Sequence, residues 1–154
     1  GLGYPGGPKV SAFAEKGKAC IPFPRPIHGL DFSFSGVKTA VINYVHTAEQ
    51  KGEKICREDI AASFQKAVVD VLVHVTLQAA RERGIRKIAL AGGVAANTCL
   101  RKEMQKAAKL QNAEVFMPSG QLCTDNGAMI SCAGYYAYIA GERADLSQNA
   151  FPSL

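Results

Sequence analysis

Two short apolar runs constrain the fold of this chain more than any other feature. They are residues 87–91 and 114–118, and residues 95–110 between them repeat apolar side chains at the spacing of a buried helix face. A β-α-β crossover makes its two strands parallel, so both carboxyl ends lie at the same edge of the sheet. We therefore expect an α/β fold in which residues 92–97 and 119–125 converge at an edge where open sheets bind ligands.

Three further helices are predicted from apolar periodicity. Residues 35–52 begin at Ser35, a good helix cap, and residues 57–84 form the longest element, which ends at a glycine. A last helix is expected over residues 126–141. Its inward-facing side chains would be Ala128, Met129, Cys132, Ala133, Tyr136 and Ile139.

Glycine and proline interrupt residues 1–30, which predicts irregular backbone apart from a short helix over residues 9–17. Residues 31–146 would form the folded lobe and residues 147–154 a tail. With 154 residues, 47% of them hydrophobic, the chain is long enough for a core. No apolar run approaches the ~20 residues of a membrane span, so we expect a cytoplasmic protein.

Neither cysteine nor histidine forms a metal motif in this sequence. The five cysteines include no Cys-x-x-Cys pair, which favours reduced, mostly buried thiols over a disulfide framework or a zinc knuckle. The three histidines are far apart in the sequence. The cysteines are Cys20, Cys56, Cys99, Cys123 and Cys132, and the histidines are His28, His46 and His74.

The net charge of +5 is compatible with a nucleic-acid partner. Basic residues gather around the end of one predicted helix and along the next. Two interpretations stay open, a nucleic-acid surface and an ordinary solvated face. The residues are Arg81, Arg83, Arg86, Lys87, Arg101, Lys102, Lys106 and Lys109.

Several residues at the expected edge have both a structural and a functional interpretation. Gly92 and Gly93 suit a plain strand-to-helix turn, and they also let a ligand approach backbone N–H groups closely. Asn97 is either a helix cap or a contact for a nucleotide base or ribose. Asp125 is either a cap or a metal ligand beside a bound phosphate, and replacing it with asparagine separates the two roles.

Other candidate positions are interpreted more simply. The pair Gly6-Gly7, which prolines flank, is typical of a rigid turn. Ser33, Ser35 and Thr39 are typical of caps and turn formers.

Four stretches carry a wider pattern. They are Tyr4-Pro5-Gly6-Gly7-Pro8, Asp31-Phe32-Ser33-Phe34-Ser35-Gly36-Val37-Lys38-Thr39, Ala91-Gly92-Gly93-Val94-Ala95-Ala96-Asn97 with Leu100-Arg101, and Cys123-Thr124-Asp125-Asn126-Gly127-Ala128-Met129-Ile130. In this order and spacing they resemble the C-terminal half of the bacterial tRNA adenosine threonylcarbamoyltransferase family, TsaD, formerly described as O-sialoglycoprotein endopeptidases or glycoproteases. The resemblance runs from Gly1 to about Leu146.

This resemblance implies an actin/Hsp70/sugar-kinase (ASKHA) type of fold, with two lobes around a nucleotide cleft, of which the chain is most of the second lobe. It also implies transfer of the threonylcarbamoyl group from threonylcarbamoyl-AMP to N6 of the adenosine 3′ of the anticodon in tRNA. The implied partners are tRNA, threonylcarbamoyl-AMP, TsaB- and TsaE-like proteins, and the N-terminal half of the same protein.

Residue by residue, the resemblance implies that Asp125 binds a metal, that Asn97 contacts the nucleotide and that Gly7 approaches the adenylate. Gly92 and Gly93 would belong to the same pocket. The metal would be Fe²⁺, with Zn²⁺ or Mg²⁺ as alternatives. In proteins of the family its two histidine ligands lie in the N-terminal half. No catalytic side chain is assigned, because the leaving AMP already activates the acyl group.

The chain also departs from the family pattern. Ser11 stands where many members have an aspartate that touches the ribose, and the family's histidine pair is not in this sequence. We therefore expect the chain alone to be inactive, and its uncovered apolar surface to favour a dimer. A non-catalytic nucleotide- or partner-binding module is the alternative function, and a glycoprotease is a weaker one.

Overall fold

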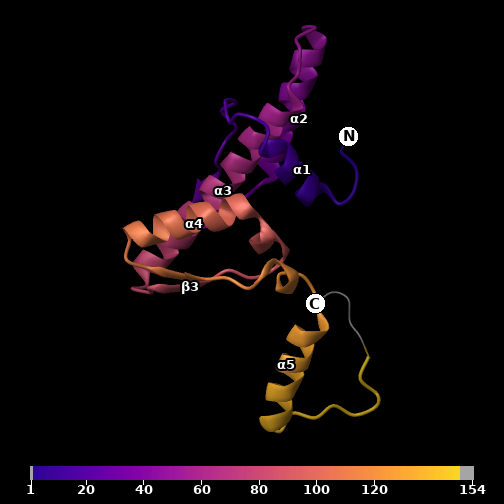
Figure 1. Ribbon diagram of the computed structural model, residues 1–154, viewed down its shortest axis with the longest axis vertical. Helices are drawn as coiled ribbons and strands as arrows, with labels where there is room; N and C mark the ends of the chain where they lie inside the picture. Colours follow the sequence, from indigo (N-terminus) through magenta and orange to yellow (C-terminus); the bar gives the residue numbers. More distant parts are fainter. Residues whose placement is uncertain (1, 150–154) are drawn as a thin grey trace.

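The computed structural model describes residues 2–149, which form an elongated body from which the last helix projects (Figure 1). Residues 150–154 of the predicted tail lie outside the described residues. The elements in chain order are α1 (Gly6–Ala14), β1 (Ile27–His28), β2 (Asp31–Phe32), α2 (Ser35–Gln50), α3 (Arg57–Glu82), β3 (Lys87–Ala89), η1 (Gly93–Ala96), α4 (Thr98–Leu110), β4 (Glu114–Phe116), η2 (Gly120–Leu122) and α5 (Gly127–Ile139).

The predicted β-α-β unit is confirmed. β3 and β4 pair in parallel with Ile88 opposite Val115, and the Leu90 N–H group extends the pairing by donating to Phe116 O at 2.9 Å. Helix α4 packs against both α3 and β4. Apolar side chains of α3, β3 and α4 form the largest core cluster, which contains Val69, Leu77, Ala80, Ile88, Leu100, Met104 and Ala108.

Helix α3 is the central element of the body. Glu58 and Asp59 lie in its first turn, where acidic side chains stabilise the positive end of the helix dipole. Helices α1, α2 and α4 all contact it. By length and composition α3 could cross a membrane, but 44% of its most apolar stretch is buried inside the protein. This burial is typical of a core helix.

The N-terminal segment is more regular than predicted. Helix α1 begins at Gly6, so Gly6 and Gly7 lie in its first turn and the interpretation as a separate rigid turn is wrong. Strands β1 and β2, which the sequence did not predict, form an antiparallel hairpin in which Ile27 pairs with Phe32. Gly29 makes this tight hairpin possible because its φ of 63° is accessible to glycine at little cost.

Hydrogen bonds fasten the residues after α1 along α3. The Lys18 N–H group donates to Asp59 Oδ1 at 2.7 Å, and the Ile21 N–H group donates to Ser63 Oγ at 3.0 Å. Ser63 is only 3% exposed, so the second bond satisfies a buried hydroxyl. Apolar contacts between α1 and the start of α3 complete this junction.

Helix α2 begins at Ser35 as predicted, but the side chain of Ser35 does not cap it. Instead, the Ser35 N–H group at the start of the helix donates to Ser33 Oγ at 3.4 Å. The Thr39 hydroxyl donates back to Ser35 O at 3.1 Å within the helix. The helix ends at Gln50, and Gly52 follows with a φ of 67°, the left-handed conformation expected after a helix.

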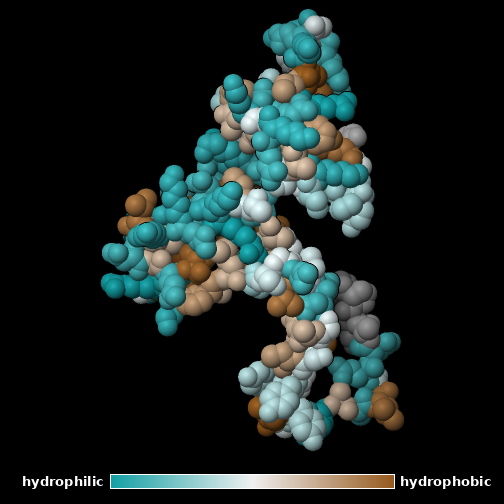
Figure 2. All heavy atoms as spheres, in the orientation of Figure 1, coloured by the Kyte–Doolittle hydropathy of each residue, from teal (hydrophilic) through white to brown (hydrophobic). Residues whose placement is uncertain are grey.

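The predicted inward face of α5 is wrong. Helix α5 contains no buried residue, and its large apolar side chains lie at the surface in the space-filling view (Figure 2). Tyr136 and Ile139 are 62% and 58% exposed. The whole chain exposes 11244 Å², whereas a compact monomer of its mass would expose about 7,500 Å². Much apolar surface of the described residues is therefore exposed.

Candidate functional site

The turn after β3 adopts a conformation that requires glycine. Gly92 has a φ of 82° and a ψ of 171°, a region of backbone space that is closed to other residues, and its carbonyl accepts from the Ala95 N–H group at 3.0 Å. The one-turn helix η1 follows. A Cβ atom built on Gly92 or Gly93 would meet nothing within 4 Å, so the space beside both residues is open. Backbone N–H groups in such a turn are accessible to an anion.

Asn97 caps helix α4, which confirms the structural interpretation of this residue. Its Oδ1 atom accepts from the Leu100 N–H group at 2.9 Å, and its Nδ2 group donates to Gln65 Oε1 at 2.8 Å. The second bond ties the start of α4 to the middle of α3. The sequence did not single out Gln65. A nucleotide contact through Asn97 stays a prediction.

A pocket of about 340 Å³ lies between α1, α3 and the start of α4. Gly7 and Asn97, which are 90 positions apart in the sequence, both line it, together with Gln65. Its other lining residues are mostly apolar, namely Gly6, Val10, Phe64, Val68, Val69, Leu72, Val94 and Leu100. Gly92, Gly93 and Asp125 are not lining residues of this pocket.

Asp125 does not cap α5, so that interpretation is wrong. The cap is its neighbour Asn126, whose Oδ1 atom accepts from the Met129 N–H group at 2.9 Å. Asp125 is exposed, and its carboxylate has no hydrogen bond or ion pair with any described residue. The carboxylate is therefore available to a ligand.

The described residues do not form a metal site by themselves. Residues 2–149 contain no group of three or more histidine, cysteine, aspartate or glutamate side chains that could hold an ion. A hard divalent cation needs several oxygen or nitrogen ligands, and Asp125 supplies one carboxylate. Any metal at this edge would need ligands from outside these residues.

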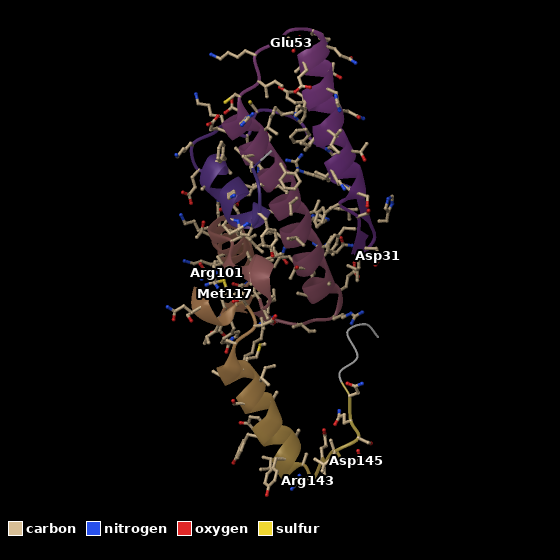
Figure 3. All side chains as sticks on the ribbon, turned by 90° about the vertical axis from the view of Figure 1, so that its right-hand side faces the viewer. Asp31, Glu53, Arg101, Met117, Arg143 and Asp145 are labelled. Carbon is tan, nitrogen blue, oxygen red and sulfur yellow. The ribbon has the colours of Figure 1, made fainter. Side chains whose placement is uncertain are left out.

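Arg101 is one of the basic residues of α4, but it does not belong to a solvated face. Its side chain is half-buried, and it donates to Ala95 O, to Pro118 O at 2.7 Å and to Cys123 Sγ at 3.0 Å. Figure 3 shows Arg101 beside Met117, where the chain leaves β4. No local sequence pattern signals this role, because two of the three acceptors, Pro118 O and Cys123 Sγ, lie 17 and 22 positions away in the sequence.

The other predicted basic residues are exposed and make no ion pair within residues 2–149. They therefore remain candidates for a nucleic-acid surface. They are Arg81, Arg83, Arg86, Lys87, Lys102, Lys106 and Lys109.

All five cysteines are free, as predicted, but only Cys123 is buried, so the expectation of mostly buried thiols is wrong. Burial is the main cause of a raised pKa at Cys99, and the negative charge of Glu103 adds to it. This thiol is therefore less ionised near neutral pH than an ordinary one.

Comparison with known proteins adds independent evidence. Residues 1–132 match the family model described as TsaD, tRNA N6-adenosine threonylcarbamoyltransferase. Proteins of that name from Clostridium botulinum (strain 657 / Type Ba4) and Moorella thermoacetica are each 53% identical to the chain over 158 aligned residues. The alignments cover 100% of this chain and 46% of each relative, so the chain spans about half their length.

A solved structure gives a similar result. The crystal structure of T. kodakarensis HypF superposes with a TM-score of 0.66 at 27% identity, over 90% of this chain and 18% of HypF. The helix-rich arrangement with a short parallel pair is thus shared with a known protein. Since the family model covers most of the sequence, the chain belongs to the TsaD family of tRNA N6-adenosine threonylcarbamoyltransferases.

Proposed function

We propose that this chain supplies the C-terminal half of a transferase that moves the threonylcarbamoyl group from threonylcarbamoyl-AMP to N6 of the adenosine 3′ of the anticodon in tRNA. One observation carries the proposal beyond family membership. Gly7 and Asn97, which the family resemblance assigns to the nucleotide, line one pocket although they lie far apart in the sequence.

The pocket has the chemistry that an adenylate requires. Its walls are largely apolar, which suits the faces of a purine ring, and Gln65 and Asn97 add polar groups that can fix its orientation. The nearby Gly92 turn leaves room for a phosphate to approach backbone N–H groups. The pocket and the turn together fit a ligand with a base at one end and an anion at the other.

The reaction itself demands little covalent chemistry from the protein. The tRNA N6 amine attacks the carbamoyl carbon, the bond from that carbon to the adenylate oxygen breaks, and AMP leaves with the electron pair while the amine gives up a proton. AMP is already a good leaving group, so no nucleophilic side chain is required. The protein's contribution is to position the two reactants and to stabilise developing negative charge.

The wider assignments follow from the same proposal. The chain would form most of the second lobe of an ASKHA-type protein in the cytoplasm, over residues 31–146. Asp125 would give one ligand to a divalent cation, with Fe²⁺ favoured over Zn²⁺ or Mg²⁺ and two histidines supplied by the N-terminal half. TsaB- and TsaE-like proteins and tRNA would be its partners. The tRNA-facing candidates are the seven exposed basic residues named above, which lie between Arg81 and Lys109.

A second candidate function is a non-catalytic binding module. The exposed apolar surface of α5 favours it, because such a surface is typical of a chain that assembles with a partner. This alternative predicts folded, partner-binding protein with no affinity for ATP or AMP.

Reconstitution tests the proposal. The chain would be mixed with the N-terminal half of a TsaD relative, TsaB- and TsaE-like proteins, ATP, threonylcarbamoyl-AMP and unmodified tRNA. We expect threonylcarbamoyladenosine in the digested tRNA by mass spectrometry, and none when this chain is omitted. No product from halves that associate and bind ATP would contradict the proposal.

A further inference from the structure

The Arg101 side chain joins three segments at the proposed ligand edge. Its Nε–H group donates to Ala95 O in η1, and its Nη2 group donates to Pro118 O at 2.7 Å and to Cys123 Sγ at 3.0 Å. We propose that Arg101 is a positioning residue that holds the loop bearing Asp125 against the turn that follows β3. This inference rests on the proposed function, because the loop matters only if it forms part of the ligand site.

Arg101 is the only hydrogen-bonding tether of this loop within residues 2–149. The last backbone bond between the two strands joins Leu90 to Phe116. Beyond it, all other hydrogen bonds of residues 118–126 stay within that stretch or lead into the first turn of α5. Helix α5 itself buries no residue against the body. Among the described residues, Arg101 therefore supplies the hydrogen bonds that hold the loop bearing Asp125 to the body.

The contacts suit arginine and not lysine. The planar guanidinium presents several N–H donors in fixed directions, so it can reach two backbone carbonyls and a thiol at once. A lysine ammonium at the same position would retain the charge without this directional fork. The Cys123 thiol, which is 4% exposed, also lies 3.5 Å from Ser119 O and so closes the loop on itself.

Loss of the tether should loosen the loop without unfolding the body. The core cluster of α3, β3 and α4 includes Leu100 and Met104, which are close to Arg101 in the sequence. It does not include Arg101 itself. An Arg101→Met substitution keeps an unbranched apolar stem and removes every donor. If Arg101 only stabilised the fold, its replacement would instead speed hydrogen exchange throughout the body, including residues 69–80.

Hydrogen exchange of the 154-residue chain, followed by mass spectrometry, tests this directly. In Arg101→Met we expect peptides covering residues 118–126 to exchange at least about tenfold faster, with residues 69–80 unchanged. Arg101→Lys should be intermediate. The matched control is Arg25→Met, which removes an exposed 2.8 Å ion pair with Asp70 and should leave residues 118–126 unchanged.

A second readout connects the tether to function. In the reconstituted transferase, Arg101→Met should lower kcat about 10- to 100-fold through misplacement of the loop, while the Kd for ATP stays the same because the pocket is intact. Unchanged exchange of residues 118–126 in both folded Arg101 variants would overturn the proposal. The two proposals can also fail separately. If residues 118–126 exchange faster in Arg101→Met but the wild-type chain supports no transfer in the reconstituted system, the tether is upheld and the proposed function is refuted.

Discussion

The side-chain amide of Asn97 donates from Nδ2 to Gln65 Oε1 at 2.8 Å, which joins the first turn of α4 to the middle of α3. The same side chain caps α4 through its Oδ1 atom. Asn97 therefore has a structural role that does not require a ligand. A ligand that contacts its amide group must compete with Gln65 or add to it.

Asn97→Asp separates the cap from the nucleotide contact. Aspartate keeps the cap but loses the donor to Gln65, so the free energy of unfolding should fall by about 1 kcal/mol, whereas Asn97→Ala loses both bonds and should lose about 2 kcal/mol. Both variants should weaken ATP binding about tenfold, since aspartate lacks the donor and repels a phosphate. Urea unfolding and calorimetric titration give the two values. Wild-type ATP affinity in both variants would show that Asn97 has only a structural role.

Gly92 and Gly93 form a matched pair for a test of backbone strain. Gly92→Ala forces a side chain into a region that only glycine adopts and should cost about 1–3 kcal/mol. Gly93 lacks a positive φ and has open space around it, so Gly93→Ala should cost less than about 1 kcal/mol. Urea unfolding of both variants measures the difference. Equal losses would contradict the strained conformation of Gly92.

The raised pKa of Cys99 predicts slow alkylation. A raised pKa leaves less thiolate at about pH 7.5, so iodoacetamide should modify Cys99 more slowly than the exposed Cys20, and the gap should narrow at about pH 9.5. Glu103→Gln removes one cause of the shift and should speed the reaction of Cys99 alone. Peptide mass spectrometry resolves the two sites. Equal rates at the lower pH would refute the prediction.

Exposed apolar residues on α5 predict that the isolated chain self-associates as a dimer. Ile130 and Ile139 are 65% and 58% exposed. Replacing both with glutamate should reduce association measured by light scattering. Because α5 contains no buried residue, the thermal unfolding midpoint should not change. A midpoint that falls by several degrees would show that α5 is packed in solution.

The sequence predicted those parts of the fold that local signals determine. The parallel pairing of residues 87–89 with 114–116 followed from two apolar runs around one amphipathic helix, and it is confirmed. The ends of α2 and α3 were likewise marked by glycines. Such signals act over a few residues, so they can be read without knowledge of the tertiary contacts.

The wrong predictions concern residues whose role depends on their three-dimensional contacts. The periodicity of residues 127–139 indicated an apolar helix, but it could not show that none of its residues would be buried among residues 2–149. Asp125 and Asn126 are adjacent and equally good caps, and only the geometry assigns the cap to Asn126. The role of Arg101 could not be predicted, because its acceptors lie in η1 and in the loop after β4, which are brought together only by the tertiary fold.

The most direct test of the ligand edge compares Asp125→Asn with Asn126→Ala in the reconstituted transferase. Asp125 has no partner among the described residues, so Asp125→Asn should change the free energy of unfolding by less than about 0.5 kcal/mol and abolish threonylcarbamoyladenosine formation. Asn126→Ala should lose about 1 kcal/mol of stability and retain most activity. Full activity in Asp125→Asn would contradict the placement of the ligand site at this edge.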